Sequence, residues 1–170
     1  MERHQFSKAE YLLFETALKN GTYVYYHLLS GTDLPIKSQD YIHEFFHKNS
    51  GKEFVGFWQN AAHQRDLERK VFRYYFFTQR LKDKGNLLHE ITSLIRNAVL
   101  ALHKISNYRR KTTFEFKKGG QWVSITENAV SYLLQYKSTI LKRMKYTLCP
   151  DEIFIQTLLW NSPFREKCTA

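Results

Sequence analysis

The chain has 170 residues, of which 26 are lysine or arginine and 16 are aspartate or glutamate, so its formal net charge is +10. This length allows one domain with a core, and aromatic residues, 16% of the chain, can fill that core. No apolar run approaches the roughly 20 residues that a membrane-spanning helix needs, and the first residues lack the apolar core of a secretion signal.

Two cysteines, Cys149 and Cys168, are too few for a disulfide framework. We therefore expect a reducing, cytoplasmic setting, with the cytoplasmic face of the membrane as a second location that fits. The positive charge would attract polyanions such as nucleic acid, anionic lipid or a nucleotide diphosphate. The basic residues occur as scattered pairs, which favours a solvated basic surface, and we expect no nucleic-acid partner.

The first part of the chain alternates helical and extended patterns. A capping box at Ser7 begins an apolar helical face, and Asn20 with Gly21 ends that helix. Aromatic and β-branched residues then predict a buried strand over residues 23–30, which stops at a polar turn.

Ser38 is a good N-cap for a helix over residues 39–48, whose buried side would be Ile42, Phe45 and Phe46. Residues 53–58 and 71–77 predict two further strands, and a polar segment, residues 59–70, separates them. Together these patterns indicate strands that alternate with helices.

The second part of the chain continues this alternation. Residues 87–105 keep the apolar spacing of a helix, and residues 114–116 predict a strand that enters a turn at Gly119 and Gly120. Thr126 can cap a helix that runs to about residue 143, and Pro150 suits the first position of a last helix. We predict a single α/β domain, with a mixed sheet flanked by helices.

Three segments carry a resemblance to a known family. Residues 28–38 read Leu-Leu-Ser-Gly-Thr-Asp-Leu-Pro-Ile-Lys-Ser, residues 119–126 read Gly-Gly-Gln-Trp-Val-Ser-Ile-Thr, and residues 150–157 read Pro-Asp-Glu-Ile-Phe-Ile-Gln-Thr. In this order they resemble motifs of the core-2/I-branching N-acetylglucosaminyltransferases and peptide O-xylosyltransferases. The resemblance implies a GT-A-like fold and an inverting, metal-independent transfer of N-acetylglucosamine, or else xylose, from a UDP-sugar to a saccharide hydroxyl.

Glu152 is the predicted catalytic residue. It lies in the first turn of the last predicted helix, where the helix dipole favours an ionised carboxylate. Such a carboxylate can take a proton from a sugar hydroxyl as the oxygen attacks, and the resemblance implies that Glu152 is the general base. The alternative is that this acidic residue only stabilises its helix end.

Ser30, Gly31 and Asp33 form the polar turn after the strand over residues 23–30. Ligands of open α/β sheets bind at the carboxyl ends of strands, so we predict that this turn contacts substrate and faces one cleft together with Glu152. A single carboxylate is poorly suited to hold a divalent ion against a diphosphate, which agrees with the metal-free reaction that the resemblance implies. The alternative is that Asp33 bonds its own turn backbone.

Gly120 and Trp122 are further candidates for substrate binding, since a glycine permits close backbone approach and a tryptophan offers a platform for a sugar ring. They could equally form a hairpin turn with a core tryptophan. The resemblance also suggests that Arg69 and Arg73 contact the acceptor, although their segment departs from the family pattern.

A different function is suggested by residues 43–47. They fit the His-Glu-x-x-His pattern, in which His43 and His47 bind zinc and Glu44 acts as base; Glu68 would be a third ligand. Because the apolar residues of this helix would face the core, both histidines would point to solvent. A zinc hydrolase remains the alternative function.

The resemblance covers only part of the family's catalytic domain. Relatives have an upstream half that binds the nucleobase and ribose, and a downstream basic pair that neutralises the leaving diphosphate. Residues 1–170 contain no segment that resembles either. We therefore expect a partial domain, weak activity of the chain alone, and a complementing polypeptide as one source of the missing parts.

Overall fold

The computed structural model describes residues 3–76, 87–106 and 108–169. The helices and strands of these residues are, in chain order, α1 (Arg3–Asn20), β1 (Tyr25–Leu28), α2 (Gln39–Lys48), β2 (Glu53–Phe54), α3 (Ala61–Phe72), α4 (Leu87–Ile105), β3 (Val123–Thr126), α5 (Glu127–Gln135), α6 (Lys137–Met144), η2 (Pro150–Glu152), α7 (Phe154–Trp160), η3 (Arg165–Lys167) and β4 (Cys168–Thr169). Among the described helices, none is both long and apolar enough to cross a bilayer.

The four strands form one sheet in the order β1-β3-β2-β4. β3 pairs antiparallel with β1 and with β2, whereas β4 pairs parallel with β2. The predicted mixed α/β fold, consistent with part of a GT-A-like domain, is therefore confirmed. β1 corresponds to the strand predicted over residues 23–30 and, as expected, buries Tyr25, Tyr26 and Leu28, but it lies at the edge of the sheet.

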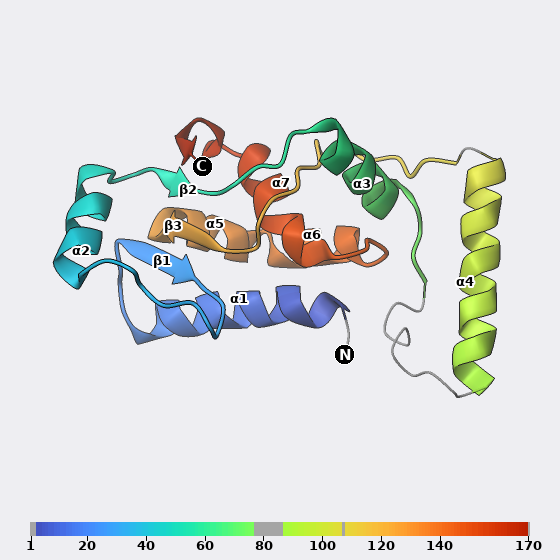
Figure 1. Cartoon of the computed structure of the whole chain (residues 1–170), viewed down its shortest axis with the longest axis horizontal. Coiled ribbons are helices and arrows are strands. Elements are labelled where there is room, and N and C mark those ends of the chain that lie inside the picture. Colours follow the sequence, from blue (N-terminus) through green and yellow to red (C-terminus); the bar gives the residue numbers. More distant parts are fainter. Residues whose placement is uncertain (1–2, 77–86, 107, 170) are drawn as a thin grey trace.

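Helices from both ends of the chain cover this sheet and form its core. Figure 1 shows α1 running alongside β1, with α5 and α6 beside it, while α4 stands at the opposite end of the molecule from α2. The ring of Tyr11 in α1 lies 5.0 Å from that of Phe154 in α7, and both side chains are fully buried. The N-terminal helix is thus packed against the segment that carries Glu152.

The predicted strand over residues 71–77 is wrong. Val71 and Phe72 end α3, residues 73–76 are irregular, and residue 77 lies outside the described residues. Asn60 begins α3, because its side-chain oxygen accepts a hydrogen bond from the His63 backbone nitrogen at 2.8 Å. Leu67 and Val71 lie one turn apart and are buried together with Lys70, so the polar segment predicted over residues 59–70 is largely an amphipathic helix.

Other elements are shorter than predicted. The strand over residues 53–58 is reduced to β2, residues 114–116 form no strand, and the helix expected from Thr126 to about residue 143 breaks at Tyr136 into α5 and α6. The last helix begins at Phe154, since Pro150 starts the short 3-10 turn η2 instead. These boundaries follow from tertiary contacts that local patterns do not contain.

The predicted helix over residues 39–48 is confirmed as α2, but its buried side is not. The Ser38 hydroxyl caps it by accepting a hydrogen bond from the Tyr41 nitrogen. Phe46 packs on Tyr25 at 4.6 Å between ring centroids, yet α2 has no buried residue and Phe45 is 40% exposed. The physical reason is its position, because α2 lies at the end of the molecule beside the edge strand (Figure 1).

Residues 117–120 are fixed against α7. The backbone nitrogen of Lys117 donates to the Thr157 hydroxyl at 3.1 Å, and that hydroxyl donates back to the Lys117 carbonyl at 3.2 Å. The Gln156 side-chain amide donates to the Gly120 carbonyl at 2.6 Å. Gln156 and Thr157 are fully buried polar residues, so these bonds are costly to break.

Gly119 lies where this segment meets the loop after β2. A Cβ atom at position 119 would lie 1.8 Å from the carbonyl oxygen of Gly56, which is a backbone atom and cannot move aside alone. Gly120, by contrast, has no atom within 4 Å of such a Cβ. Close packing therefore requires a glycine at position 119.

Gly119→Ala should reduce the free energy of unfolding by about 1–3 kcal/mol, the usual cost of overpacking. The Gly120→Ala chain, as the matched control, should stay within about 0.5 kcal/mol of the parent. Urea unfolding followed by circular dichroism measures both values. Equal stability of the two variants would contradict the packing described here.

Candidate functional site

Glu152 ends η2, directly before α7. The chain turns sharply into η2, because Cys149 adopts the left-handed conformation with φ of 51°. The Glu152 carbonyl accepts a hydrogen bond from the Gly119 nitrogen at 3.0 Å, which ties η2 to residues 117–120. The Glu152 side chain is 30% exposed, so solvent and ligands can reach it.

Two lysines and a second carboxylate surround Glu152. The amine of Lys70 lies 3.0 Å from Glu152 Oε2 and 3.0 Å from Asp66 Oδ2. The amine of Lys118 lies 3.2 Å and 2.5 Å from the same two oxygens. We call Asp66, Lys70, Lys118 and Glu152 the lysine–carboxylate cluster. Its lysines are nearly buried, at 9% and 6% exposure, whereas its carboxylates are partly open to solvent.

The two oxygens of Glu152 differ in their surroundings. Both lysines bind Oε2, while no side chain or backbone group in the described part of the chain bonds Oε1. The lysines therefore fix the orientation of the carboxylate and leave one oxygen available to a ligand.

The cluster is charged at neutral pH. Burial acts to raise the pKa of Glu152, but the hydrogen bonds from Lys70 and Lys118 outweigh it and hold the pKa below its usual value. The same balance, with Lys118, Arg69 and Lys70 as donors, holds the pKa of Asp66 well below its usual range. Burial acts to lower the pKa of Lys70, yet its bonds to both carboxylates raise it overall.

The sequence patterns did not predict that Lys70 and Lys118 bind Glu152. We expected a helix dipole to keep Glu152 ionised, but η2 has three residues and the two lysines supply the positive charge instead. Asp66 and Lys70 are four residues apart, the spacing of an ion pair on a helix. Reading residues 61–72 as a helix would have shown this pair, whereas nothing local indicates Lys118.

The turn that holds Ser30, Gly31 and Asp33 is closed by hydrogen bonds between its own residues. The Asp33 carboxylate accepts a hydrogen bond from the Ser30 nitrogen at 2.8 Å, and the Asp33 nitrogen donates to the Ser30 carbonyl at 3.3 Å. Asp33 is exposed. Within the described residues, no hydrogen bond or ion pair joins this turn to Glu152, so a shared cleft stays a prediction.

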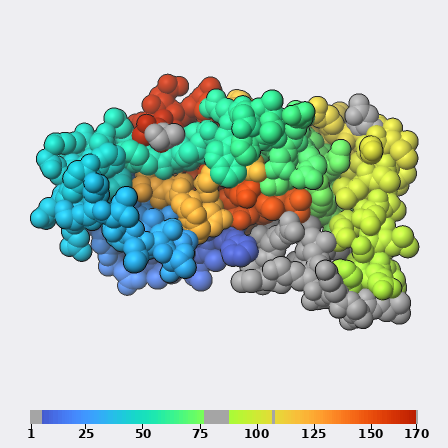
Figure 2. Space-filling model, in the orientation of Figure 1, coloured from blue at the N-terminus to red at the C-terminus, as the bar shows by residue number. Residues whose placement is uncertain are grey.

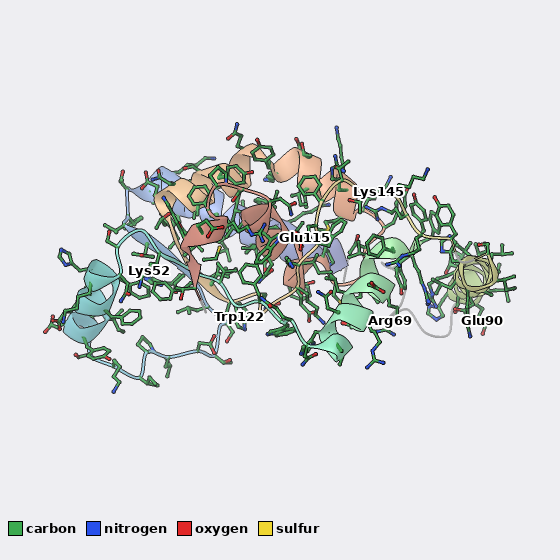
Figure 3. The ribbon with its side chains drawn as sticks, turned by 90° about the horizontal axis from the view of Figure 1, so that it is seen from above. Lys52, Arg69, Glu90, Glu115, Trp122 and Lys145 are labelled. Atoms are coloured by element: carbon green, nitrogen blue, oxygen red, sulfur yellow. The ribbon has the colours of Figure 1, made fainter. Side chains whose placement is uncertain are left out.

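Gly120 and Trp122 both lie directly before β3, which begins at Val123. The Gly120 carbonyl accepts a hydrogen bond from Gln156. The position that requires a glycine is 119, not 120. Trp122 is 44% exposed, so it is not the core tryptophan of the alternative interpretation. Figure 3 shows Trp122 and Arg69 on different elements, apart along the length of the molecule.

Arg69 and Arg73 line a pocket of about 290 Å³ at α3 and the C-terminal end of α4. We call it the basic pocket, since its wall includes the five cationic side chains of Arg65, Arg69, Arg73, Lys104 and Arg109. Arg69 also bonds the Asp66 carboxylate at 2.8 Å. Of the residues predicted to contact substrate, Arg69 is thus joined to the cluster around Glu152.

Of the candidate zinc ligands, Glu68 lies apart from the two histidines. His43 and His47 line an apolar pocket of about 630 Å³ between β1 and α2, together with His27. Glu68 lies on α3, pairs with Arg109 at 3.3 Å and faces the basic pocket. Over the residues that the structure describes, no group of three or more His, Cys, Asp or Glu side chains is arranged to hold a metal ion.

The pKa shifts of the cluster predict a pH-dependent stability. The pKa values of Asp66 and Glu152 are lower in the folded than in the unfolded chain, so their stabilisation is complete above roughly pH 5 and is lost as the pH falls through the folded values. Asp66→Asn should lower the free energy of unfolding by about 1–3 kcal/mol at pH 7, and by progressively less as the pH falls below roughly 4.

Glu68→Gln is the matched control on the same helix, because the Glu68–Arg109 pair is exposed and should contribute less than about 1 kcal/mol. Urea unfolding between pH 3 and pH 7 measures both variants. If Asp66→Asn lowers the free energy of unfolding as much at pH 3 as at pH 7, the charges of the cluster do not stabilise the fold.

Comparisons with known proteins agree with this arrangement of motifs. The model of the Core-2/I-Branching enzyme family matches residues 1–170. Xylosyltransferase 2 of Rattus norvegicus is 26% identical over 141 residues, as are the proteins of the same name from Canis lupus familiaris and Mus musculus. The match takes in 79% of this chain but only 14% of each relative. The chain therefore belongs to the Core-2/I-branching enzyme family of glycosyltransferases, as its three motifs predict.

Proposed function

We propose that this chain forms the acceptor side of a glycosyltransferase. The reaction is transfer of N-acetylglucosamine, or of xylose, from a UDP-sugar to a saccharide hydroxyl, with inversion and without a metal ion. The observation that carries the proposal is the state of Glu152, an ionised carboxylate whose Oε2 is held by Lys70 and Lys118 and whose Oε1 is free of both. Membership of the family and similarity to proteins named xylosyltransferase support sugar transfer.

Glu152 is the proposed general base. Its Oε1 accepts a hydrogen bond from the acceptor hydroxyl, whose oxygen forms a bond to the anomeric carbon while the bond from that carbon to the diphosphate oxygen breaks. The diphosphate leaves with the bonding electrons and the proton passes to Glu152. Because the pKa of Glu152 is low, the proton transfers late, when the attacking oxygen has become strongly acidic.

Groups other than Lys70 and Lys118 must bind the UDP-sugar donor. In an inverting reaction the leaving diphosphate lies opposite the attacking hydroxyl, so Lys70 and Lys118, which bind the base, are on the wrong side to neutralise it. The chain spans 14% of the length of the relatives it matches. We infer that further polypeptide binds the nucleotide, while the turn at Ser30, Gly31 and Asp33, with Gly120 and Trp122, contributes contacts to the sugars.

A reducing, cytoplasmic setting is part of this proposal. Cys149 and Cys168 are not joined in a disulfide, and burial raises the pKa of Cys168 to about 11, which makes its thiol unreactive. Neither cysteine therefore needs an oxidising compartment.

Glu152→Gln tests the proposed base. The variant keeps the size of the side chain but cannot accept the proton, so sugar transfer should fall by about 10²- to 10⁴-fold. The assay uses radiolabelled UDP-N-acetylglucosamine and UDP-xylose with saccharide acceptors, and NMR of the product to determine the anomeric configuration. Transfer should persist in EDTA.

Glu166→Gln is the matched control, since Glu166 also lies in a short 3-10 turn but is exposed and outside the cluster. It should transfer sugar at the parental rate. Unchanged turnover of the Glu152→Gln chain would rule out its role as base, and retention of anomeric configuration would rule out the inverting mechanism.

A further inference from the structure

The charge of the basic pocket is only partly compensated. Arg69 pairs with Asp66 at 2.8 Å and Arg109 pairs with Glu68 at 3.3 Å. Arg65, Arg73 and Lys104 have no carboxylate within ion-pair distance among the described residues. Three cationic side chains therefore converge on one hollow with no counter-ion among the residues that the structure describes, an arrangement that favours an anion.

The walls of the basic pocket also include aromatic rings. The guanidinium of Arg109 lies 4.7 Å from the centre of the Phe72 ring, which restricts its position. Tyr108 is 48% exposed and stacks on His103 at 5.4 Å between centroids. Flat, exposed rings beside arginines are suited to a sugar ring that carries an acidic group.

The size of the basic pocket limits its ligand. Its volume of about 290 Å³ is at the lower end of the roughly 300–1,000 Å³ of small-molecule sites. Such a hollow holds a single sugar residue. Figure 2 shows the neighbouring surfaces of α3 and the C-terminal end of α4, at the side of the molecule remote from α2.

The basic pocket is connected to Glu152 through α3. Arg65 and Arg69 lie one turn apart on the face of α3 that lines the pocket, and Arg73 follows directly after the helix, while Asp66 and Lys70 lie on the adjoining face. Arg69 lines the pocket and bonds Asp66, whose other oxygen bonds both lysines that hold Glu152. The pocket thus adjoins the side of the site where the base, and hence the acceptor hydroxyl, would lie.

We propose that the basic pocket binds the acidic group of an anionic acceptor saccharide, a sugar residue that carries a carboxylate, sulfate or phosphate. This inference rests on the proposed function, since it names the substrate class of the same site. The diphosphate of the donor is the less favoured ligand, because it would leave from the side opposite the base. The pocket selects among acceptors, and Glu152 acts on the one that is held.

Calorimetric titration of the 170-residue chain with two matched probes tests this proposal. Cellobiouronic acid and cellobiose differ only in one carboxylate, and the acid should bind at least about tenfold more tightly at low salt, an advantage that salt reduces. Arg73→Ala combined with Lys104→Ala should remove this preference. Lys19→Ala combined with Lys142→Ala, which removes the same charge from exposed positions outside the pocket, should keep it. Circular dichroism establishes that both double variants fold.

The proposal would be overturned if the two sugars bound equally, or if both double variants lost the preference for the acid to the same extent. Displacement of the acid by pyrophosphate or UDP at lower concentration would assign the pocket to the donor instead, and displacement by oligo-dT would assign it to nucleic acid. Binding is measured without turnover, so each proposal can be refuted without the other. Transfer to neutral acceptors without acid binding would refute only the pocket, and acid binding together with unchanged turnover of the Glu152→Gln chain would refute only the role of Glu152 as base.

Discussion

The fixed position of residues 117–120 is the constraint on which the site depends. Thr157 and Gln156 bond this segment from α7, and the Gly119 backbone packs against Gly56 so closely that no side chain fits. This placement brings the Lys118 amine to Asp66 and Glu152. Without it, Glu152 would lose one of its two lysine partners, and the pKa values of Glu152 and Asp66 would rise. Packing of glycine on backbone therefore helps to keep both carboxylates ionised.

The lysine–carboxylate cluster reconciles two demands on Glu152. A base in a basic protein must be ionised and oriented, yet must keep an oxygen for the substrate. Lys70 and Lys118 satisfy the first demand through Oε2, and their restriction to that oxygen satisfies the second. The low pKa that results makes Glu152 a weak base, so positioning of the hydroxyl would matter more for catalysis than basicity. The basic pocket, on the adjoining face of α3, fits that requirement. An acidic sugar residue bound there would align the neighbouring sugar residue, whose hydroxyl attacks.

Local signals in the sequence were sufficient for some parts of the fold and not for others. The caps at Ser38 and Thr126 and the apolar spacing of α4 depend on neighbouring residues, so the pattern predicted them. α3 was missed because its charged faces obscured Leu67 and Val71, and the aromatic residues after it resemble a strand. Glu152 was found through a motif, but its partners lie far from it in the sequence: Lys70 is 82 positions away, and Lys118 lies in a different segment. Such pairings depend on the sheet and on α7, which no local pattern specifies.

The central claim is that Glu152 Oε1 receives the acceptor hydroxyl. A crystal structure of this chain soaked with an acceptor saccharide that the transfer assay identifies tests it most directly. We expect one sugar hydroxyl within hydrogen-bond distance of Oε1, about 2.6–3.2 Å, with Lys70 and Lys118 still bound to Oε2. A saccharide held at the turn of Asp33 or elsewhere, with every hydroxyl remote from Glu152, would contradict it.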